Sequence, residues 1–210
     1  MKDALHLCMR LVLLGLPAES RILCVGVGEG AELLYLADAF PGWRFTALEP
    51  SARMLEICRA RAEAQEISSR CTFHEGYIDS LPGDDGYDAA TCILVSHYLG
   101  DRAARIGLFR AIHDRLRPGG ILVNADLAAD ATSRTFPAML EGWKSMLSFS
   151  GMSAEQVDAQ VERFSRGMSA MSVPEIEEVL TSSGFLDPTL FCQTLLIHAW
   201  YSKRRVVGRG

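Results

Sequence analysis

The sequence lacks the residue spacings from which metal sites are built. Its 210 residues include six cysteines and five histidines, yet no CxxC or HxxxH pair occurs among them, and such pairs are the usual signature of a metal site. Most of the cysteines fall in apolar runs, where a free thiol is a small buried hydrophobe in a reducing compartment. We therefore expect no metal and a cytoplasmic location.

The sequence also has no long hydrophobic run and little basic charge. No stretch approaches the roughly 20 apolar residues of a membrane-spanning helix. The N-terminal segment resembles a signal peptide, but Asp3 and Arg10 interrupt it, and apolar residues at 5, 9, 12 and 13 predict an amphipathic helix ending near Gly15. The net charge is −5, and the basic run 203–205 with Arg209 is typical of a solvated tail. A membrane or nucleic-acid partner is not expected.

The composition that remains is that of a globular protein. Apolar residues make up 49% of the chain and charged residues 22%, which is enough apolar material for a sizeable core. The length predicts one domain, residues 1–210, that carries an insertion rather than a partner domain.

The chain is organised around residues 21–49, which read as strand, glycine turn, helix, strand and acid. An apolar run leads into Gly26-Val27-Gly28-Glu29-Gly30, and a second apolar run ends on Glu49. This order is the first unit of a nucleotide-binding α/β domain. The glycines let the backbone approach a ligand, and the helix start offers free N–H groups. Glu49 is placed where a carboxylate can accept both hydroxyl protons of a ribose.

Strand and helix patterns then alternate along the chain. We expect a helix over 51–66, strands over 71–74 and 87–95, a helix over 102–116 ended by the turn 117–120, and a strand over 121–125. A capping box at 172–175 begins a last helix that Gly184 closes. The runs 190–194 and 196–201 have no helix between them and predict an antiparallel hairpin. The pattern favours a doubly wound α/β sheet.

The glycine motif alone fits two ligands. Read as Gly26-x-Gly28-x-x-Ala31, it matches a nicotinamide dinucleotide fingerprint, and read as Gly26-x-Gly28-x-Gly30, it matches the loop that holds S-adenosylmethionine. Glu49 suits the ribose of either ligand. A dinucleotide enzyme would need a second phosphate-binding half, and the sequence shows none.

The motifs downstream of the loop resemble those of the class I S-adenosylmethionine-dependent methyltransferases. They are ALEPSARML, HEGYIDSLP, YDAATCILVSHYL, the RLRPGGILV turn and the terminal hairpin, and with the loop they cover roughly residues 20–202. The resemblance implies a Rossmann-like sheet of order 3-2-1-4-5-7-6 with strand seven antiparallel. It also implies S-adenosylmethionine as cofactor and a methyl transfer by in-line displacement, which depends mainly on positioning.

By position in that family, nine residues are expected to contact the cofactor. The loop would pass under the methionyl part, Glu49 would hold the ribose, and the others would surround the adenine or line the wall near the sulfonium, together with Ile93. The nine residues are Gly26, Val27, Gly28, Glu49, Pro50, Met54, Tyr77, Ile78 and Cys92. Some of these side chains, Met54 and Ile93 above all, could instead be ordinary core.

Two positions depart from the family pattern. The acid two residues before the first glycine is replaced by Cys24, and the acid after the strand-three glycine is replaced by Tyr77. The first change removes a charge from the network around the methionine amino group. The second leaves the adenine amino group to a backbone carbonyl or to Asp79, while Tyr77 could stack on the ring.

The ending of the chain is similar to the carboxy-S-adenosylmethionine synthase branch, which works on tRNA wobble-uridine modification. The arginine and asparagine that hold the carboxylated cofactor in that branch align with Val179 and Ile93 here. We therefore expect an ordinary methyl donor. The rival hypotheses are a tRNA-modification accessory of that type and an NAD(P)-dependent oxidoreductase.

His97 and Asp126 are the candidates for a general base. His97 follows strand four and Asp126 ends strand five, and the carboxyl ends of strands form the ligand crevice of such sheets. Either residue could instead cap the turn in which it lies.

Residues 131–170 are expected to form a helical insertion that acts as a lid and sets specificity. The segment is rich in methionine and aromatic residues, and Met139, Trp143 and Met146 are the candidates for binding an apolar or planar small-molecule methyl acceptor. The same residues could instead pack two helices onto the sheet or form a homodimer interface.

Overall fold

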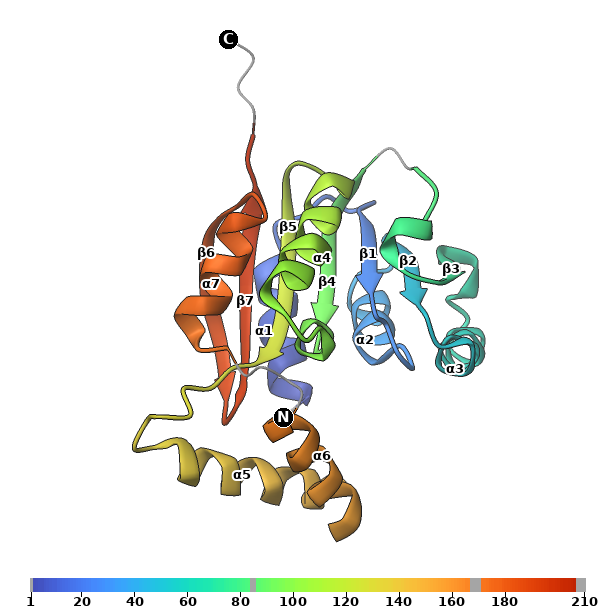
Figure 1. Cartoon of the computed structure of the whole chain (residues 1–210). Coiled ribbons are helices and arrows are strands. Elements are labelled where there is room, and N and C mark those ends of the chain that lie inside the picture. The colour runs from blue at the N-terminus through green and yellow to red at the C-terminus, as the bar shows by residue number, and fades with distance from the viewer. Residues whose placement is uncertain (1, 84–85, 167–170, 207–210) are drawn as a thin grey trace.

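The computed structural model describes residues 2–83, 86–166 and 171–206 (Figure 1). Residues 167–170 of the predicted insertion and Arg209 of the basic tail lie outside the described residues. The helices are α1 Lys2–Leu13, α2 Ala31–Ala39, α3 Ala52–Ala64, α4 Arg102–Arg115, α5 Phe136–Phe149, α6 Ala154–Arg166 and α7 Val173–Ser182. Short 3₁₀ helices lie at η1 Ser68–Arg70, η2 Ile78–Ser80 and η3 Ser96–Tyr98.

One seven-stranded sheet forms the centre of the molecule. Its strands are β1 Arg21–Val25, β2 Arg44–Glu49, β3 Cys71–Glu75, β4 Tyr87–Ile93, β5 Leu116–Leu127, β6 Phe185–Thr194 and β7 Ile197–Arg204. The order is β3-β2-β1-β4-β5-β7-β6, and β7 runs antiparallel to both of its neighbours. The predicted fold class, strand order and hairpin are confirmed.

Helices cover both faces of the sheet, which is why its inner strands are almost continuously apolar. On one face, α4 and α7 pack over β4, β5 and β7, with Phe109, Val179 and Trp200 in their core. On the other face, α1, α2 and α3 pack over β1 and β2. Figure 1 shows α4 and α7 in front of the sheet and α1 and α2 behind it.

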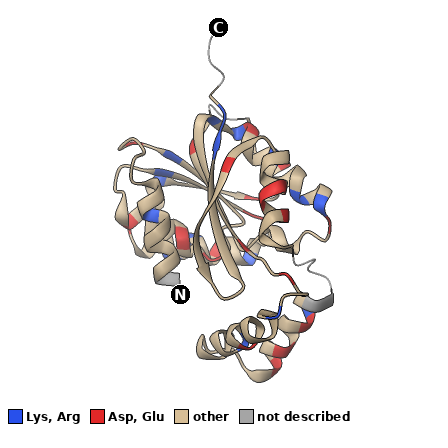
Figure 2. Cartoon of the chain, turned by 90° about the vertical axis from the view of Figure 1, so that its left-hand side faces the viewer, with Lys and Arg blue, Asp and Glu red and all other residues tan. Residues whose placement is uncertain are grey.

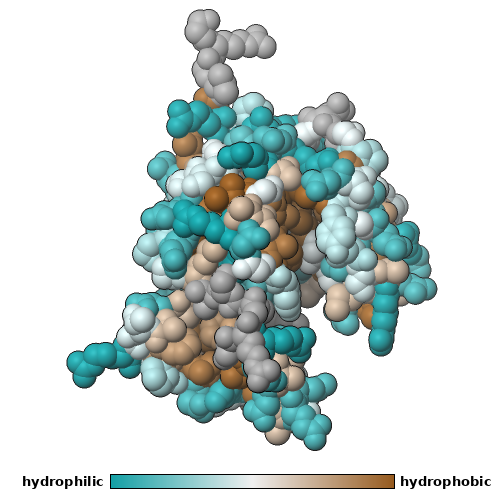
Figure 3. All heavy atoms as spheres, viewed as in Figure 1, coloured by the Kyte–Doolittle hydropathy of each residue, from teal (hydrophilic) through white to brown (hydrophobic). Residues whose placement is uncertain are grey.

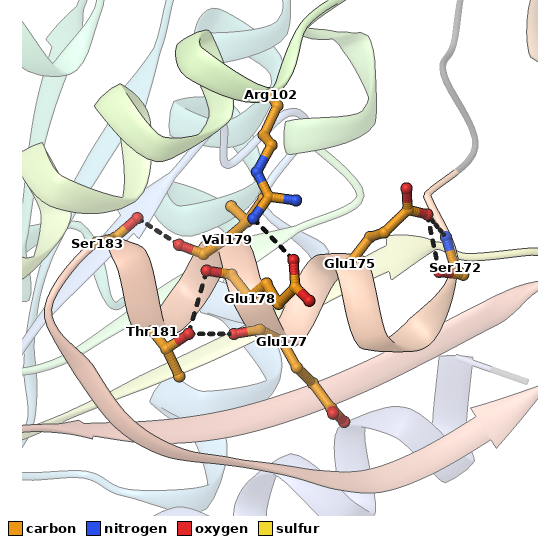
Figure 4. Close-up of polar contacts among 8 residues, drawn as sticks. All are labelled: Arg102, Ser172, Glu175, Glu177, Glu178, Val179, Thr181 and Ser183. Carbon is orange, nitrogen blue, oxygen red and sulfur yellow. Dashed lines mark hydrogen bonds and ion pairs between the residues drawn. The ribbon is translucent and has the colours of Figure 1, made fainter.

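The helix ends follow the sequence signals. Ser51 accepts the backbone N–H of Met54 at 3.4 Å and so caps α3. At α7, Ser172 and Glu175 form the predicted capping box, with the Ser172 N–H donating to the Glu175 carboxylate at 2.8 Å (Figure 4). An ion pair of 3.0 Å between Arg102 and Glu178 joins α7 to α4 in the same view.

Two strands are longer than the sequence indicated. β5 begins at Leu116 rather than at Ile121, because Leu116 pairs with Tyr87 and the predicted turn 117–120 is absorbed at an irregularity in the β4–β5 register. β6 begins at Phe185 rather than at Leu190, and its Pro188 falls within an irregular stretch of this edge strand, where a missing N–H is tolerated. In both strands, a proline that suggests a strand boundary lies inside the strand, at an irregularity in the pairing.

The insertion forms two helices that project from one edge of the sheet. The carboxyl ends of β1, β2 and β4 point to this edge, and α5 and α6 lie below it in Figure 1. Trp143 and Phe164 pack against Leu127 at the end of β5 and against Leu196 and Ile197 where β7 begins. None of the described helices is both long and apolar enough to cross a membrane. Figure 2 shows the Lys and Arg of the described residues scattered over many elements rather than gathered on one face.

Candidate cofactor cavity

The glycine loop after β1 has a backbone that only glycine adopts easily. Gly26, Gly28 and Gly30 have φ angles of 65°, 54° and 85°, in the left-handed region. A Cβ atom on Gly26 would lie 2.5 Å from Cγ2 of Val95, and one on Gly30 would lie 2.6 Å from Sγ of Cys58. A Cβ atom on Gly28 would meet no atom within 4 Å. Gly28 therefore faces open space, where a ligand can approach the backbone.

Glu49 at the end of β2 holds this loop in place. Its side chain is only 7% exposed, and its two carboxylate oxygens accept the backbone N–H groups of Gly28 and Ser51, each at 3.0 Å. A buried carboxylate needs such donors, because the charge has lost its water. The contacts tie the loop after β1 to the start of α3, and the carboxylate also borders a cavity.

That cavity has a volume of about 910 Å³ and opens at the carboxyl ends of β1, β2 and β4. Helix α4 and η2 form its sides, and hydrophobic surface is visible in a recess beside α4 in Figure 3. Its size suits a nucleoside-sized ligand. Eight of the nine predicted cofactor residues line it: Gly26, Val27, Gly28, Glu49, Pro50, Met54, Tyr77 and Ile78.

Cys92 is the predicted cofactor residue that does not line the cavity. Its side chain is 1% exposed and packs with Ala90 and Phe109 in the core under α4. Successive strand residues point to opposite faces, and the next residue, Ile93, does border the cavity as expected. The placement of Cys92 on the wall was therefore wrong.

His97 and Asp126 lie together but away from the cavity. His97 is 3% exposed and Asp126 is 1% exposed, and Nδ1 of His97 lies 2.6 Å from Oδ1 of Asp126. The same carboxylate accepts the backbone N–H of His97 at 3.0 Å and the hydroxyl of Ser96. Neither side chain borders the cavity. These contacts join the end of β5 to η3. They match the alternative in which His97 and Asp126 cap a turn rather than act in catalysis.

The three predicted acceptor residues of the insertion do not reach this cavity either. Trp143 is 2% exposed and forms the centre of the apolar cluster between α5, α6 and the sheet, with Met139 and Met146 packed around it. Trp143 is the only large aromatic side chain among the buried residues of α5, so burying it dominates the packing of that helix. Met139 borders a second, smaller cavity instead.

The charges around the main cavity are all of one sign. Glu32 in the first turn of α2, Glu49, and Asp79 in η2 border it, whereas no Lys or Arg does so within the described part of the chain. Such a cavity favours a cation and disfavours phosphate groups, which are usually held by Arg or Lys. Glu32 was missed because an acid in a first helical turn is an ordinary feature. Its side chain is only 6% exposed.

Burial keeps the cysteines near the loop neutral. Burial and, after it, the Glu32 charge raise the pKa of Cys58 to about 11 and hold the pKa of Cys24 well above its usual range. For Cys92, burial again acts first, followed by the charges of Asp126 and Glu32, and the pKa is also well above its usual range. Cys24 therefore supplies no negative charge in place of the missing acid. Glu32, which borders the cavity, is the candidate to take the place of that acid.

The fold is the one found in solved S-adenosylmethionine-dependent methyltransferases, and part of the chain resembles a methyltransferase family in sequence. Residues 22–120, just under half of the chain, match the profile of a family described as a methyltransferase domain. This segment includes the glycine loop, Glu49 and all of the residues that line the main cavity.

Several known proteins with similar sequence or structure are methyltransferases. The erythromycin 3''-O-methyltransferase of Saccharopolyspora erythraea is 27% identical over 115 residues, which are 54% of this chain and 36% of that protein. An O-methyltransferase family protein from Burkholderia thailandensis superposes with a TM-score of 0.69 at 17% identity, over 99% of this chain and 59% of that one. The methyltransferase CalO1 of calicheamicin biosynthesis, solved with S-adenosylhomocysteine, gives 0.68 at 15% identity, over 96% of this chain and 54% of that one. The chain thus spans little more than a third of the curated relative and somewhat more than half of each structure.

Proposed function

We propose that the protein is an S-adenosylmethionine-dependent methyltransferase that acts on a small or planar metabolite. The observation that carries the proposal is the cavity itself: Gly28 faces open space, and the described residues of the lining include three carboxylates and no Lys or Arg. S-adenosylmethionine has a sulfonium and an ammonium group against one carboxylate, so its net charge complements this lining. The family match and the methyltransferase structures support the same assignment.

The residues present fit the cofactor from one end to the other. Glu49 borders the cavity beside Gly28 and would accept hydrogen bonds from the ribose hydroxyls. Met54 and Tyr77 would flank the adenine, and Asp79 would accept from its amino group. Glu32 would pair with the amino group of the methionyl part, which is the role left open by Cys24. When bound, the cofactor supplies an activated methyl group, and the protein must align the acceptor and exclude water.

His97 and Asp126 are assigned a positioning role. Their buried contacts fix η3, and the residues on either side of His97 in this turn, Val95, Tyr98 and Leu99, border the cavity. The pair would therefore shape the wall near the cofactor without touching it.

The same cavity argues against the two rival functions. A nicotinamide dinucleotide would place a pyrophosphate near three carboxylates, and none of the lining residues that the structure describes is a Lys or Arg. A carboxylated cofactor of the tRNA-modification branch would leave its added carboxylate without a cation for the same reason. The similarity of the C-terminal half to that branch, the homodimer, the cytoplasmic location and the lid function of 131–170 stay predictions.

Thermal unfolding with S-adenosylhomocysteine tests the proposal. We expect millimolar S-adenosylhomocysteine to raise the Tm, because a ligand that binds only the folded state stabilises it. Glu49→Ala should abolish the shift by removing the ribose acceptor and freeing the loop, whereas Glu56→Ala, on the exposed face of α3, should leave it intact. A Tm that responds to NAD(P) but not to S-adenosylhomocysteine would refute the assignment.

A further inference from the structure

Two half-buried cysteines from distant parts of the sequence meet on the face of the sheet that α1 covers. Cys8 lies in α1, which runs behind the sheet in Figure 1, and Cys192 lies in the edge strand β6. The two side chains are hydrogen-bond partners. Both thiols are free. The two sulfur atoms are therefore neighbours that are not bonded to each other.

The packing of α1 on the sheet brings the two thiols together. Leu5 is 8% exposed and packs against Ala125 of β5 and Ala199 of β7. Cys192 packs against the same apolar cluster and is the cross-strand neighbour of Ala199. Residues three apart lie on one face of a helix, so Leu5 and Cys8 face the same strands. Buried contacts one turn away thus fix Cys8 beside Cys192.

The other four cysteines are placed differently. Cys24, Cys58 and Cys92 are at most 1% exposed, so solvent and small oxidants do not reach them. Cys71 is half-buried like the pair, but its thiol donates to the carbonyl oxygen of Ile67 at 3.4 Å. Cys71 is therefore a control of similar exposure for the Cys8–Cys192 pair.

The two thiols of the pair are not equivalent. Burial, followed by the charge and the hydrogen bond of Cys8, raises the pKa of Cys192. A hydrogen bond that raises the pKa of a thiol stabilises its protonated form, so the Cys192 thiol donates and the sulfur of Cys8 accepts. The nucleophile in thiol oxidation is the thiolate. Since Cys192 is held protonated, we expect Cys8 to react first.

We propose that Cys8 and Cys192 form a reversible disulfide when the protein meets hydrogen peroxide, which bonds α1 to β6. This inference does not depend on the proposed function. Such a pair is typical of the transient, redox-sensing disulfides of reducing compartments. The link joins residues far apart in the sequence, and cross-links of this kind restrict the unfolded chain most. The oxidised protein is therefore the more stable form.

The reaction balances with one peroxide for each pair of thiols. The sulfur of Cys8 attacks one peroxide oxygen, the O–O bond breaks, and the leaving oxygen takes the thiol proton and departs as water. Cys8 is then a sulfenic acid. The sulfur of Cys192 attacks the sulfur of Cys8, the S–O bond breaks, and the Cys192 proton leaves with that oxygen as a second water. The two thiols lose two electrons, and the peroxide gains them.

Peptide mapping after oxidation tests the pairing. The folded protein is treated with hydrogen peroxide, free thiols are alkylated, and the protein is digested without reduction. We expect mass spectrometry to show the Cys8 peptide linked to the Cys192 peptide, and dithiothreitol to separate them. Cys71→Ser should keep the link. Cys192→Ser should instead leave a sulfenic acid on Cys8 that dimedone labels, whereas Cys8→Ser should leave Cys192 almost unlabelled.

Thermal unfolding of the wild-type protein tests the link without any variant. The oxidised protein should unfold at a Tm roughly 5–10 °C above that of the reduced protein, and dithiothreitol should remove the difference. Equal Tm values, a covalent dimer, or a link from Cys8 to any cysteine other than Cys192 would overturn the proposal. The Tm shift with S-adenosylhomocysteine, measured on the reduced protein, tests the proposed function separately.

Discussion

Glu32→Gln separates the two halves of the proposed cofactor. The substitution removes one negative charge from the cavity wall and keeps the shape of the side chain. S-adenosylhomocysteine carries an amino group on its amino-acid part, whereas 5′-methylthioadenosine has the same nucleoside and no amino acid. If Glu32 pairs with the amino group, the substitution should weaken only the first ligand.

The size of the effect follows from the burial of Glu32. Two unit charges about 4 Å apart attract by about 4 kcal/mol at an effective dielectric constant of 20. Loss of water from both groups reduces this, and hydrogen bonds to charged groups contribute about 1.5–3 kcal/mol net. With Glu32 only 6% exposed, we expect the dissociation constant of S-adenosylhomocysteine to rise roughly 10- to 100-fold.

Isothermal titration calorimetry on three proteins checks this expectation. Glu29→Gln is the matched control, because Glu29 lies in the glycine loop three residues before Glu32, pairs with Arg61 at the surface and does not border the cavity. It should change either affinity by less than about twofold. A similar loss for both ligands in Glu32→Gln, or an unchanged affinity for S-adenosylhomocysteine, would contradict the pairing of Glu32 with the amino group.

Three further perturbations address the loop and its thiol. Gly28→Ala should cost about 1–2 kcal/mol of stability and weaken S-adenosylhomocysteine at least about tenfold, since its Cβ atom would enter the open space above the loop. Gly26→Ala should destabilise more, because its Cβ atom would lie 2.5 Å from Val95; equal unfolding free energies in urea would be inconsistent with this geometry. Between pH 8.5 and 11 the wild type should lose about 2 kcal/mol more stability than Cys58→Ala. The folded-state pKa of Cys58 is raised to about 11, so the unfolded chain releases its proton first as the pH rises, and parallel stability curves for the two proteins would exclude the shift.

The sequence predicted the parts of the fold that depend on local pattern. Apolar runs, capping residues and glycine turns gave the order of strands and helices, and Ser51, Ser172 and Gly184 mark helix ends as expected. The lengths of the strands were harder to predict from the sequence. Leu116 and Phe185 begin strands because of pairing with distant residues, Tyr87 and Arg204, and pairing partners leave no local signal.

The main cavity was predictable because most of its predicted lining residues fall at fixed positions along a repeated strand–loop–helix unit. The loop glycines and Glu49 belong to one such unit, and eight of the nine predicted residues meet at one cavity. The orientation of individual side chains was not predictable. Cys92 and Ile93 are neighbours in the sequence, yet only Ile93 borders the cavity, because the pleat of β4 sends them to opposite faces.

By itself, the sequence determined the doubly wound sheet and the position of its glycine loop, because both depend on periodicity and on backbone conformations that few residues adopt. Tertiary structure alone decided which charges face the main cavity. It placed Glu32 on the cavity wall, withdrew His97 and Asp126 into a buried pair, and brought His198 from the last strand to a second cavity. Burial and direction of a side chain depend on what packs beside it, and those neighbours come from distant parts of the chain.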